Sequence, residues 1–460
     1  MILCTRVEAR DFRVLFARCS AGRARGPAPP LLIRFAGSTR TLCSTTDEGV
    51  VLMHSSVVEG ERDELLVLPG SILGEVEGST DESVKLDRQS KLRGVLHWHT
   101  GDQPRTLPVE LILPGKQHEI PALPSLTSVP PKLLSALHEC GRSAARDSGR
   151  FALSKIQFQG KSGRVIGTDG KAALVCRGFK FGFTENVLVA AVPVFGAKPL
   201  SRVSEVHVGR TATHLVVVAG PWSVWLPTDD KSRYPDVAGI IPRQPPTIVE
   251  IDEQDAVELL RVLPTLPGNS DENRPVTITI EANGTVTIRG RDPNSAETKE
   301  SALVRSRTTG TPTHLTLDRR FLARALSLGC HTLKLTPDKP FVLEGNGISF
   351  VALPLDSPSV EAAATGPPPS TAELSMPQPS PDPERNQPME PAKMNGHTPP
   401  RGDPSDPLFA AEELRDALAD ATTKAARLVA VLKAGRKEKK VLASVFANLK
   451  QLGLDTGGPP

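Results

Sequence analysis

Two histidines come closest to a catalytic or metal-binding pattern in this sequence. His97 and His99, in GVLHWHTGD, are two residues apart, so on a strand both imidazoles lie on one face. Such a pair could supply half of a metal site. No third ligand stands at a suggestive spacing, and histidines that flank a tryptophan are usually surface residues. We therefore expect no metal and no cofactor, and a metal hydrolase is the weakest functional hypothesis.

Other catalytic patterns are missing from the sequence. It has no Walker A lysine motif, no G-x-S-x-G and no cysteine–histidine pair at catalytic spacing. Its six cysteines form no C-x-x-C pair, which favours reduced thiols over a zinc ribbon or a disulfide framework. We predict that the chain is not an enzyme.

Arginines recur in three groups that could contact phosphate. An arginine on a helix is often only part of a solvated face, and a net charge of +3 does not by itself indicate a polyanionic partner. Recurrence at equivalent places favours a shared role for the groups. They lie on or after helix-like stretches and comprise Arg10, Arg23 and Arg25, then Arg142, Arg146 and Arg150, then Arg319, Arg320 and Arg324.

A polar turn marks the repeat that positions these groups. Thr168-Asp169-Gly170, in RVIGTDGKAALVC, separates two apolar runs and predicts a hairpin. Similar breaks occur at Asp47, 122 residues before Asp169, and at Asp292, 123 residues after it. A fixed interval of this length indicates an internal repeat.

Each repeat combines helix-like and strand-like stretches. The opening helices are predicted within residues 7–20, 130–145 and 252–263, and shorter ones within 69–78, 192–204 and 317–329. Two helices with several antiparallel strands per repeat make an α+β fold. We predict three domains over residues 1–118, 119–244 and 245–356.

The composition changes after Asp356. Residues 357–407 are rich in Pro, Ser, Ala and Gly and are predicted to be a disordered linker. Asp406-Pro407 then resembles a helix start, so residues 408–460 are predicted to form a helical tail. The first 25 residues carry too many charges for a signal peptide, and no apolar run is long enough to span a membrane.

Three tandem α+β units with these motifs resemble the bacterial beta sliding clamp, the processivity factor of the replicative DNA polymerase. The resemblance covers roughly residues 1–356 and is most specific in GTDGKAALV, in RYPDVAGIIP and in FVALPL. It implies a ring-shaped homodimer, joined head to tail, whose helices line a central hole. It also implies a cytoplasmic, nucleoid-associated protein that encircles double-stranded DNA and binds the polymerase, the clamp loader and other clamp-motif proteins.

The resemblance places the nine arginines around the hole, where they would contact phosphates without reading bases. One feature departs from this pattern, because the opening helix of the third unit is acidic. Either the ring holds DNA weakly or off-centre, or these acids point into a domain interface. They are Asp252, Glu253, Asp255 and Glu258.

The resemblance also implies a pocket for partner peptides between the second and third domains. An apolar cleft with a few polar rim atoms suits a short peptide with one or two large apolar anchors. The alternative for Leu353 and Leu355 is that they end a strand and pack inward. The pocket residues would be Thr168, Gly170, Lys171, Ala172, Leu174, Pro235, Ile240, Val351, Leu353, Pro354 and Leu355.

Several pocket positions differ from the residues common in the clamp family. The replacements make the expected walls smaller and less basic, which favours a different peptide or weaker binding. They are Lys171 for histidine, Ala172 for arginine, Ala173 for leucine, and Gly239 and Asp356 for arginine.

The end of the tail carries a further match. Gln451-Leu452-Gly453-Leu454-Asp455 resembles the peptides that dock in clamp pockets, although such a short match is often accidental. If it docks, the tail would inhibit the chain's own pocket or link rings. The main alternative to a clamp is a clamp-like scaffold that no longer encircles DNA.

Overall fold

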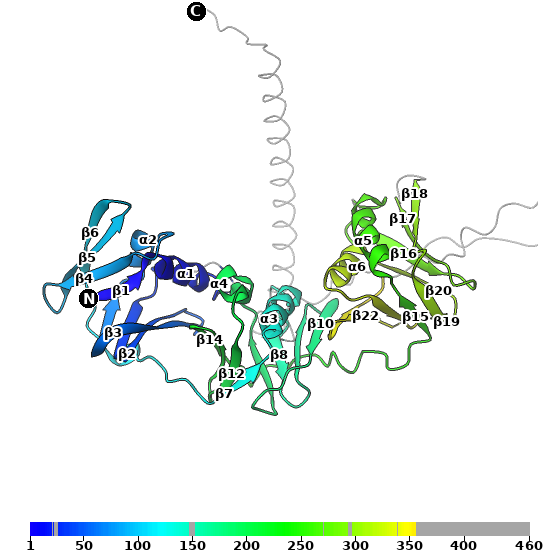
Figure 1. The fold of residues 1–460 in the computed structure, drawn as a ribbon. Coiled ribbons are helices and arrows are strands. Elements are labelled where there is room, and N and C mark those ends of the chain that lie inside the picture. The colour runs from blue at the N-terminus through cyan, green and yellow to red at the C-terminus, as the bar shows by residue number, and fades with distance from the viewer. Residues whose placement is uncertain are drawn as a thin grey trace, which may run out of the picture. The chain divides into compact units, whose positions relative to one another are not determined.

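The computed structural model describes residues 1–20, 22, 26–146, 152–269, 271–292, 297–337 and 339–355. These residues form six α-helices and 23 strands, and every pair of neighbouring strands is antiparallel, which confirms the predicted α+β class (Figure 1). The predicted linker and helical tail lie outside the described residues.

The first repeat pairs a long helix with a short one. Helices α1 and α2 contact each other. The elements are β1 (Ile2–Thr5), α1 (Arg6–Phe16), β2 (Leu31–Thr45), β3 (Val51–Leu68), α2 (Ile72–Val76), β4 (Ser83–Arg88), β5 (Arg93–Thr100), β6 (Gln103–Glu110) and the 3₁₀-helix η1 (Lys116–His118).

The second repeat has the same plan, with α3 packed against the 3₁₀-helix η2. Its elements are β7 (Leu126–Val129), α3 (Lys132–Ser143), β8 (Lys155–Gln159), β9 (Arg164–Thr168), β10 (Ala172–Arg177), β11 (Asn186–Ala190), η2 (Pro193–Gly196), α4 (Lys198–Ser201), β12 (Val206–Arg210), β13 (His214–Ala219) and β14 (Trp222–Pro227).

In the third repeat, α5 contacts α6. Its elements are β15 (Thr247–Glu250), α5 (Glu253–Val262), η3 (Leu263–Thr265), β16 (Pro275–Ile280), β17 (Val286–Arg291), β18 (Thr298–Ala302), β19 (Arg307–Gly310), β20 (Thr313–Asp318), α6 (Arg319–Ser327), β21 (Thr332–Leu335), β22 (Phe341–Gly345) and β23 (Ile348–Ala352). All described residues belong to one compact unit, so the predicted domain limits remain predictions.

The opening helices follow from local sequence. Thr5 and Glu8 form a capping box at the start of α1, in which the Thr5 side chain accepts from the Glu8 N–H and the Glu8 carboxylate accepts from the Thr5 N–H. In α3 the predicted apolar face is confirmed, since Leu133, Leu137 and Cys140 are buried.

Two sheets cross the boundaries between repeats. The six-stranded sheet runs β2-β3-β14-β13-β12-β7 and joins the first repeat to the second through β3 and β14. The nine-stranded sheet runs β11-β8-β9-β10-β23-β22-β21-β15-β19 and joins the second to the third through β10 and β23. Each junction pairs two strand edges that would otherwise be open. The two remaining sheets are four-stranded, β1-β4-β5-β6 and β18-β17-β16-β20.

Gly167 lets α3 lie close to the nine-stranded sheet. An added Cβ at Gly167, on β9, would come within 2.1 Å of the Cys140 carbonyl oxygen on α3. Helix α3 contacts both β9 and β10, so this close approach packs the helix against the core of the second repeat. A side chain at residue 167 would force the helix off the sheet.

We predict that Gly167→Ala lowers the free energy of unfolding by about 1–3 kcal/mol, because the added methyl group overpacks the α3–β9 contact. Gly74→Ala on α2 is the control, since an added Cβ there meets nothing within 4 Å. It should be neutral or stabilise by about 0.5–1 kcal/mol. Urea unfolding measures both, and equal stabilities of the two variants would contradict the close approach.

Helix α5 is fixed at its start by two acidic side chains. Asp252 caps the helix by accepting from the Gln254 N–H at 2.8 Å. Asp255 is 4% exposed and accepts from the N–H groups of Arg305 and Ser306 at 2.8 and 2.9 Å, and from the Ser306 hydroxyl at 2.8 Å. Burial raises the pKa of Asp255, but these hydrogen bonds outweigh it and hold the pKa below its usual value.

We predict that Asp255→Asn lowers the free energy of unfolding at neutral pH by about 1–3 kcal/mol, because a neutral amide oxygen accepts these hydrogen bonds more weakly than a carboxylate and the amide NH2 would face the Arg305 guanidinium. The pKa is lower in the folded chain, so the carboxylate's contribution is present above the unfolded pKa and is lost as the pH falls through the folded pKa. The variant should therefore lose less stability than the wild type below about pH 5. Exposed Glu253→Gln on the same helix is the control. Parallel pH profiles for Asp255→Asn and wild type would contradict this role.

Candidate nucleic-acid and peptide interfaces

Four of the predicted DNA-binding arginines keep side-chain surface exposed on or beside helices. Arg10 on α1 pairs with Asp11 at 2.9 Å, and its side chain is 41% exposed. Arg142 on α3 pairs with Glu139 at 3.1 Å, and its side chain is 60% exposed. Arg146 and Arg320 are also exposed, and Arg320 forms a two-pronged contact with Asp318, while Arg23, Arg25 and Arg150 lie outside the described residues.

Arg319 corrects the prediction for its group. It is 3% exposed, and its guanidinium holds the loop before β16 instead of facing solvent. Burial lowers the pKa of this side chain. A guanidinium enclosed in this way cannot reach a phosphate without unfolding its surroundings. It donates to the carbonyl oxygens of Arg274 (3.1 Å), Leu263 (3.1 Å), Leu266 (2.6 Å), Pro275 (3.0 Å) and Pro267.

Arg324 lies at the end of α3, which is an element of the neighbouring repeat. Its guanidinium donates to the carbonyl oxygens of Glu139 at 2.9 Å and Arg142 at 3.4 Å. It also lies 6.0 Å from the ring centre of Phe350. A cation at a helix C-terminus satisfies free carbonyls and the helix dipole. Arg324 therefore ties α6 to α3 and forms, with Arg142 and Arg146, a basic group at the end of α3.

The acidic residues of the third opening helix divide into two kinds. Asp252 caps the start of α5 and Asp255 is its buried acceptor, so both carboxylates have hydrogen-bond partners within the protein. Glu253 and Glu258 are exposed, and Glu258 lies 3.8 Å from Arg261. The negative surface of this helix is therefore smaller than its sequence indicates.

Sequence reasoning missed two exposed cations in the second repeat. Lys198 begins α4 and Arg202 caps its end, and both are exposed. The signal was available, because the second helix of the third repeat also carries basic residues. Side chains of α3 and of the η2–α4 segment line a cleft of 430 Å³ between them.

The Thr168-Asp169-Gly170 turn has an internally bonded structure. The buried Thr168 hydroxyl donates to the Ala172 carbonyl at 2.7 Å, and Asp169 accepts from the N–H groups of Lys171 and Ala172. Gly170 has φ +89°, which favours glycine. Its absent Cβ would be 3.5 Å from Leu153. The turn therefore holds Lys171 at the surface without using its side chain.

The two faces of β10 correct part of the predicted pocket. Leu174 is fully buried in the main core, on the face that carries α3. Ala172 packs into the same core, whereas Ala173 packs on the opposite face with Val351 and Val237. Side chains alternate along a strand, so Leu174 cannot share a surface with Val351. Ala173 therefore belongs with the candidate pocket. The alternation of side chains along a strand, applied to the sequence, could have identified it.

A segment after β14 covers this second face. The Tyr234 hydroxyl donates to the Ile166 carbonyl at 3.2 Å, and Val237 is 4% exposed beneath the segment. Pro235 is half-buried, and Ile240 is 48% exposed. This segment therefore supplies one exposed apolar side chain near a buried apolar patch.

The residues after β23 connect the turn to the third repeat. The Leu353 N–H donates to the Lys171 carbonyl at 3.1 Å, and the Leu355 N–H donates to the Thr316 carbonyl at 2.8 Å. Leu353 is 48% exposed, so it does not pack inward, while Pro354 and Leu355 are half-buried. The exposed Leu353 is thus hydrogen-bonded through its backbone to the Thr168-Asp169-Gly170 turn, and it lies at the surface next to Lys171.

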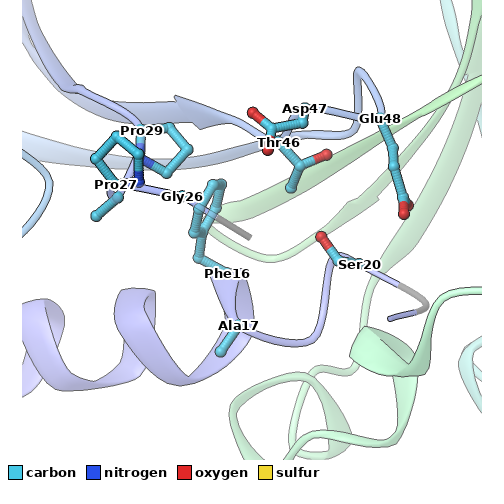
Figure 2. A pocket seen from close by; sticks show the side chains of 10 residues that line it. Phe16, Ala17, Ser20, Gly26, Pro27, Pro29, Thr46, Asp47 and Glu48 are labelled. Atoms are coloured by element: carbon cyan, nitrogen blue, oxygen red, sulfur yellow. The ribbon is translucent and has the colours of Figure 1, made fainter. Parts of the chain in front are cut away.

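The copy of the turn in the first repeat lines a cavity that the sequence did not predict. Thr46, Asp47 and Glu48 face the end of α1 across a space of 270 Å³ (Figure 2). Phe16 and Pro27 to Pro29 supply its apolar wall. The Thr46 hydroxyl also bonds to the residue four positions further on, but it accepts from the Val50 N–H at 3.1 Å, whereas the Thr168 hydroxyl donates to a carbonyl.

The two histidines lie on one face of β5, as expected, and both are exposed. His99 lies 2.9 Å from Glu82. The part of the chain that the structure describes contains no group of three or more His, Cys, Asp or Glu side chains placed to hold a metal ion. No helix among the described residues is long and apolar enough to cross a membrane.

Solved structures of the DNA polymerase III beta sliding clamp are similar to this chain. The Pseudomonas aeruginosa clamp bound to griselimycin has 16% identity and a TM-score of 0.61, over 77% of this chain and 98% of its own. Another structure of the P. aeruginosa beta subunit has 16% identity and a TM-score of 0.60, over 76% and 99%. The Thermotoga maritima beta subunit has 16% identity and a TM-score of 0.61, over 77% and 99%.

No protein family model matches the chain, and no curated protein matches its sequence. The likeness to the solved clamps extends over nearly the whole length of those proteins and over all three repeats of this one. The described part of the chain therefore has the fold of the bacterial beta sliding clamp, as its motifs predicted.

Proposed function

We propose that this chain is a DNA sliding clamp, a non-catalytic processivity factor that a second copy closes into a ring around double-stranded DNA. The observation that carries this proposal is the extent of the match, since the chain covers 98% of the P. aeruginosa clamp with both inter-repeat sheet junctions formed. Such a protein needs no chemical step. A tether to DNA raises the effective concentration of a polymerase at the primer end.

The basic residues on the helices support DNA as the ring's occupant. Arg142 and Arg324 both pair with the carboxylate of Glu139 near the end of α3, and the exposed Arg146 follows three residues after that helix. Arg10 adds an exposed cation on α1. Interactions of this kind are made with phosphates and do not depend on base sequence.

Loading onto DNA tests the proposal directly. We predict that the full chain, loaded by a clamp loader onto a nicked circular plasmid, stays on the circle through gel filtration and is lost when the plasmid is cut. A closed ring can leave DNA only at an end. The alternative is a scaffold that does not encircle DNA, which the exposed carboxylates of Glu253 and Glu258 would favour. Such a scaffold would be retained equally on circular and linear plasmids.

Charge removal tests the arginines. We predict that Arg142→Ala with Arg146→Ala weakens binding to duplex DNA and lowers the slope of log K against log salt by about 1 for each phosphate that an arginine no longer neutralises. The matched control is Arg34→Ala with Arg88→Ala, which removes two exposed-face arginines from strands β2 and β4. An unchanged slope for the α3 variant would exclude these side chains as phosphate ligands.

We also propose that the surface around Leu353, Ile240 and Lys171 binds a partner peptide. Leu353 and Ile240 are exposed, and in sequence they lie two residues after Val351 and three residues after Val237, which form a buried patch with Ala173. Exposed apolar side chains next to a packed patch suit a peptide with large apolar anchors. The replicative polymerase and the clamp loader are the partners that this proposal implies.

We predict that Leu353→Ala with Ile240→Ala weakens peptide binding about tenfold or more, because the apolar anchors of the peptide would pack against smaller side chains. The probes are a fluorescent peptide of residues 448–456 of this chain and a clamp-binding peptide from a bacterial replicative polymerase, both read by fluorescence anisotropy. Leu123→Ala, an exposed leucine in the loop before β7, is the control. If neither probe binds the wild type, the proposed pocket is wrong; if only the polymerase peptide binds, the tail does not dock.

A further inference from the structure

Three phenylalanines follow β10 in the loop that leads to β11. The loop, residues 178–185, reads GFKFGFTE, and it crosses the ends of β8 and β9, which lie between β10 and β11 in the sheet. The Phe179 N–H donates to the Gly163 carbonyl at 3.2 Å, and the Lys161 N–H donates to the Thr184 carbonyl at 3.0 Å. Both ends of the loop are therefore bonded to the turn between β8 and β9.

The rings of Phe179, Phe181 and Phe183 form a phenylalanine stack. The ring centres of Phe179 and Phe181 are 5.9 Å apart with an interplanar angle of 27°, and those of Phe181 and Phe183 are 5.3 Å apart at 9°. The buried Phe158 contacts Phe181 edge-on at 5.4 Å. Phe179 is 5% exposed, whereas Phe181 and Phe183 are half-buried. The stack therefore runs from the core toward the surface, where Phe183 is its last ring.

Three exposed lysines lie on the segments that carry or contact the phenylalanine stack. Lys132, at the start of α3, has its Nζ 5.6 Å from the ring centre of Phe179. Lys180 stands between the first two rings of the stack in sequence, and Lys161 lies in the turn that bonds the far end of the loop. Each ring thus has a lysine on its own or a bonded segment.

The loop and the turn carry little negative charge. Residues 160–163 and 178–185 contain one carboxylate, that of Glu185. It lies 3.4 Å from the guanidinium of Arg210, which offsets its charge. The lysines therefore give these segments an excess of positive charge, and that excess is complementary to phosphate.

Stacked aromatic rings among lysines suit single-stranded nucleic acid. Bases stack on aromatic side chains regardless of sequence, and lysines neutralise the phosphates that link the bases. In a duplex both faces of each base are already covered by neighbouring bases, so a duplex offers little to an aromatic ring. An apolar peptide would cover the rings without using the lysines.

We infer that the phenylalanine stack and its lysines bind single-stranded DNA, with a base stacked on Phe183 and phosphates beside Lys161 and Lys180. The choice of DNA over RNA rests on the proposed function, because a ring around duplex DNA at a primer end lies next to the single-stranded template. The site is separate from the basic group at the end of α3. Lys132 and Arg142 are on opposite ends of that helix, about 15 Å apart along its axis.

The experiment measures binding of the full chain to a fluorescent oligothymidylate of about 20 nucleotides, by anisotropy at low salt. Phe183→Leu keeps an apolar side chain but removes the ring, and it should weaken binding about tenfold. Phe183→Tyr keeps the ring and should bind as the wild type does. Phe321→Leu, at a half-buried phenylalanine on α6, is the control and should change nothing. Urea unfolding verifies that each variant is folded.

Charge removal tests the lysines and the separation of the two sites. Lys161→Ala with Lys180→Ala should weaken oligothymidylate binding and lower its dependence on salt, because phosphate contacts are lost. Lys91→Ala with Lys116→Ala, at two exposed lysines of the first repeat, is the matched control. In a chain that already carries Arg142→Ala, Phe183→Leu should still weaken binding about tenfold, since the stack lies at the other end of α3.

Three results would each overturn the inference. They are no binding of oligothymidylate by the wild type, equal binding by Phe183→Leu and Phe183→Tyr, and tighter binding of oligouridylate than of oligothymidylate. Retention on circular plasmids reports separately on the proposed function. A chain that is retained on circles but binds oligothymidylate independently of the Phe183 ring refutes only this inference, and ring-dependent binding without retention refutes only the clamp.

Discussion

Hydrogen bonding between strands of different repeats is the constraint on which the rest of this structure depends. Strands β10 and β23 pair over Ala172 to Cys176 and Ile348 to Ala352. A polar cluster fixes that register, since Glu344 accepts from Ser349 at 2.9 Å, from Lys334 at 2.6 Å and from Arg177 at 3.0 Å. A shift by one residue would turn every side chain of β23 to the other face and separate these partners.

The same junction assembles both candidate interfaces. It brings α6 beside α3, where Arg324 caps the C-terminal carbonyls and adds its charge to Arg142. On its other face it places Leu353 against the Lys171 turn and Val351 beside Ala173. One backbone pairing therefore positions the proposed DNA-binding side chains on the helical side and the proposed peptide surface on the opposite side of the sheet.

Charged side chains in this fold serve two purposes that their residue types do not distinguish. Arg319 and Asp255 have enough backbone partners to be held inside the protein, where loss of those partners would leave a buried charge. Arg142 and Glu258 lie near them in sequence or on equivalent helices, yet both are exposed. The available surface charge is thus set by backbone geometry as well as by composition.

The sequence by itself determined the repeat, the α+β class and the opening helices, because turn residues, caps and apolar periodicity are local and recur at a fixed interval. It also located the turn at Thr168 and the exposed Leu353. It misplaced Leu174 and Arg319. Val351 packs against one face of β10, and the guanidinium of Arg319 is surrounded by backbone carbonyl oxygens. Both arrangements depend on segments that are far apart in the chain. Only the tertiary structure decides these, because burial and backbone partners are properties of the packed chain.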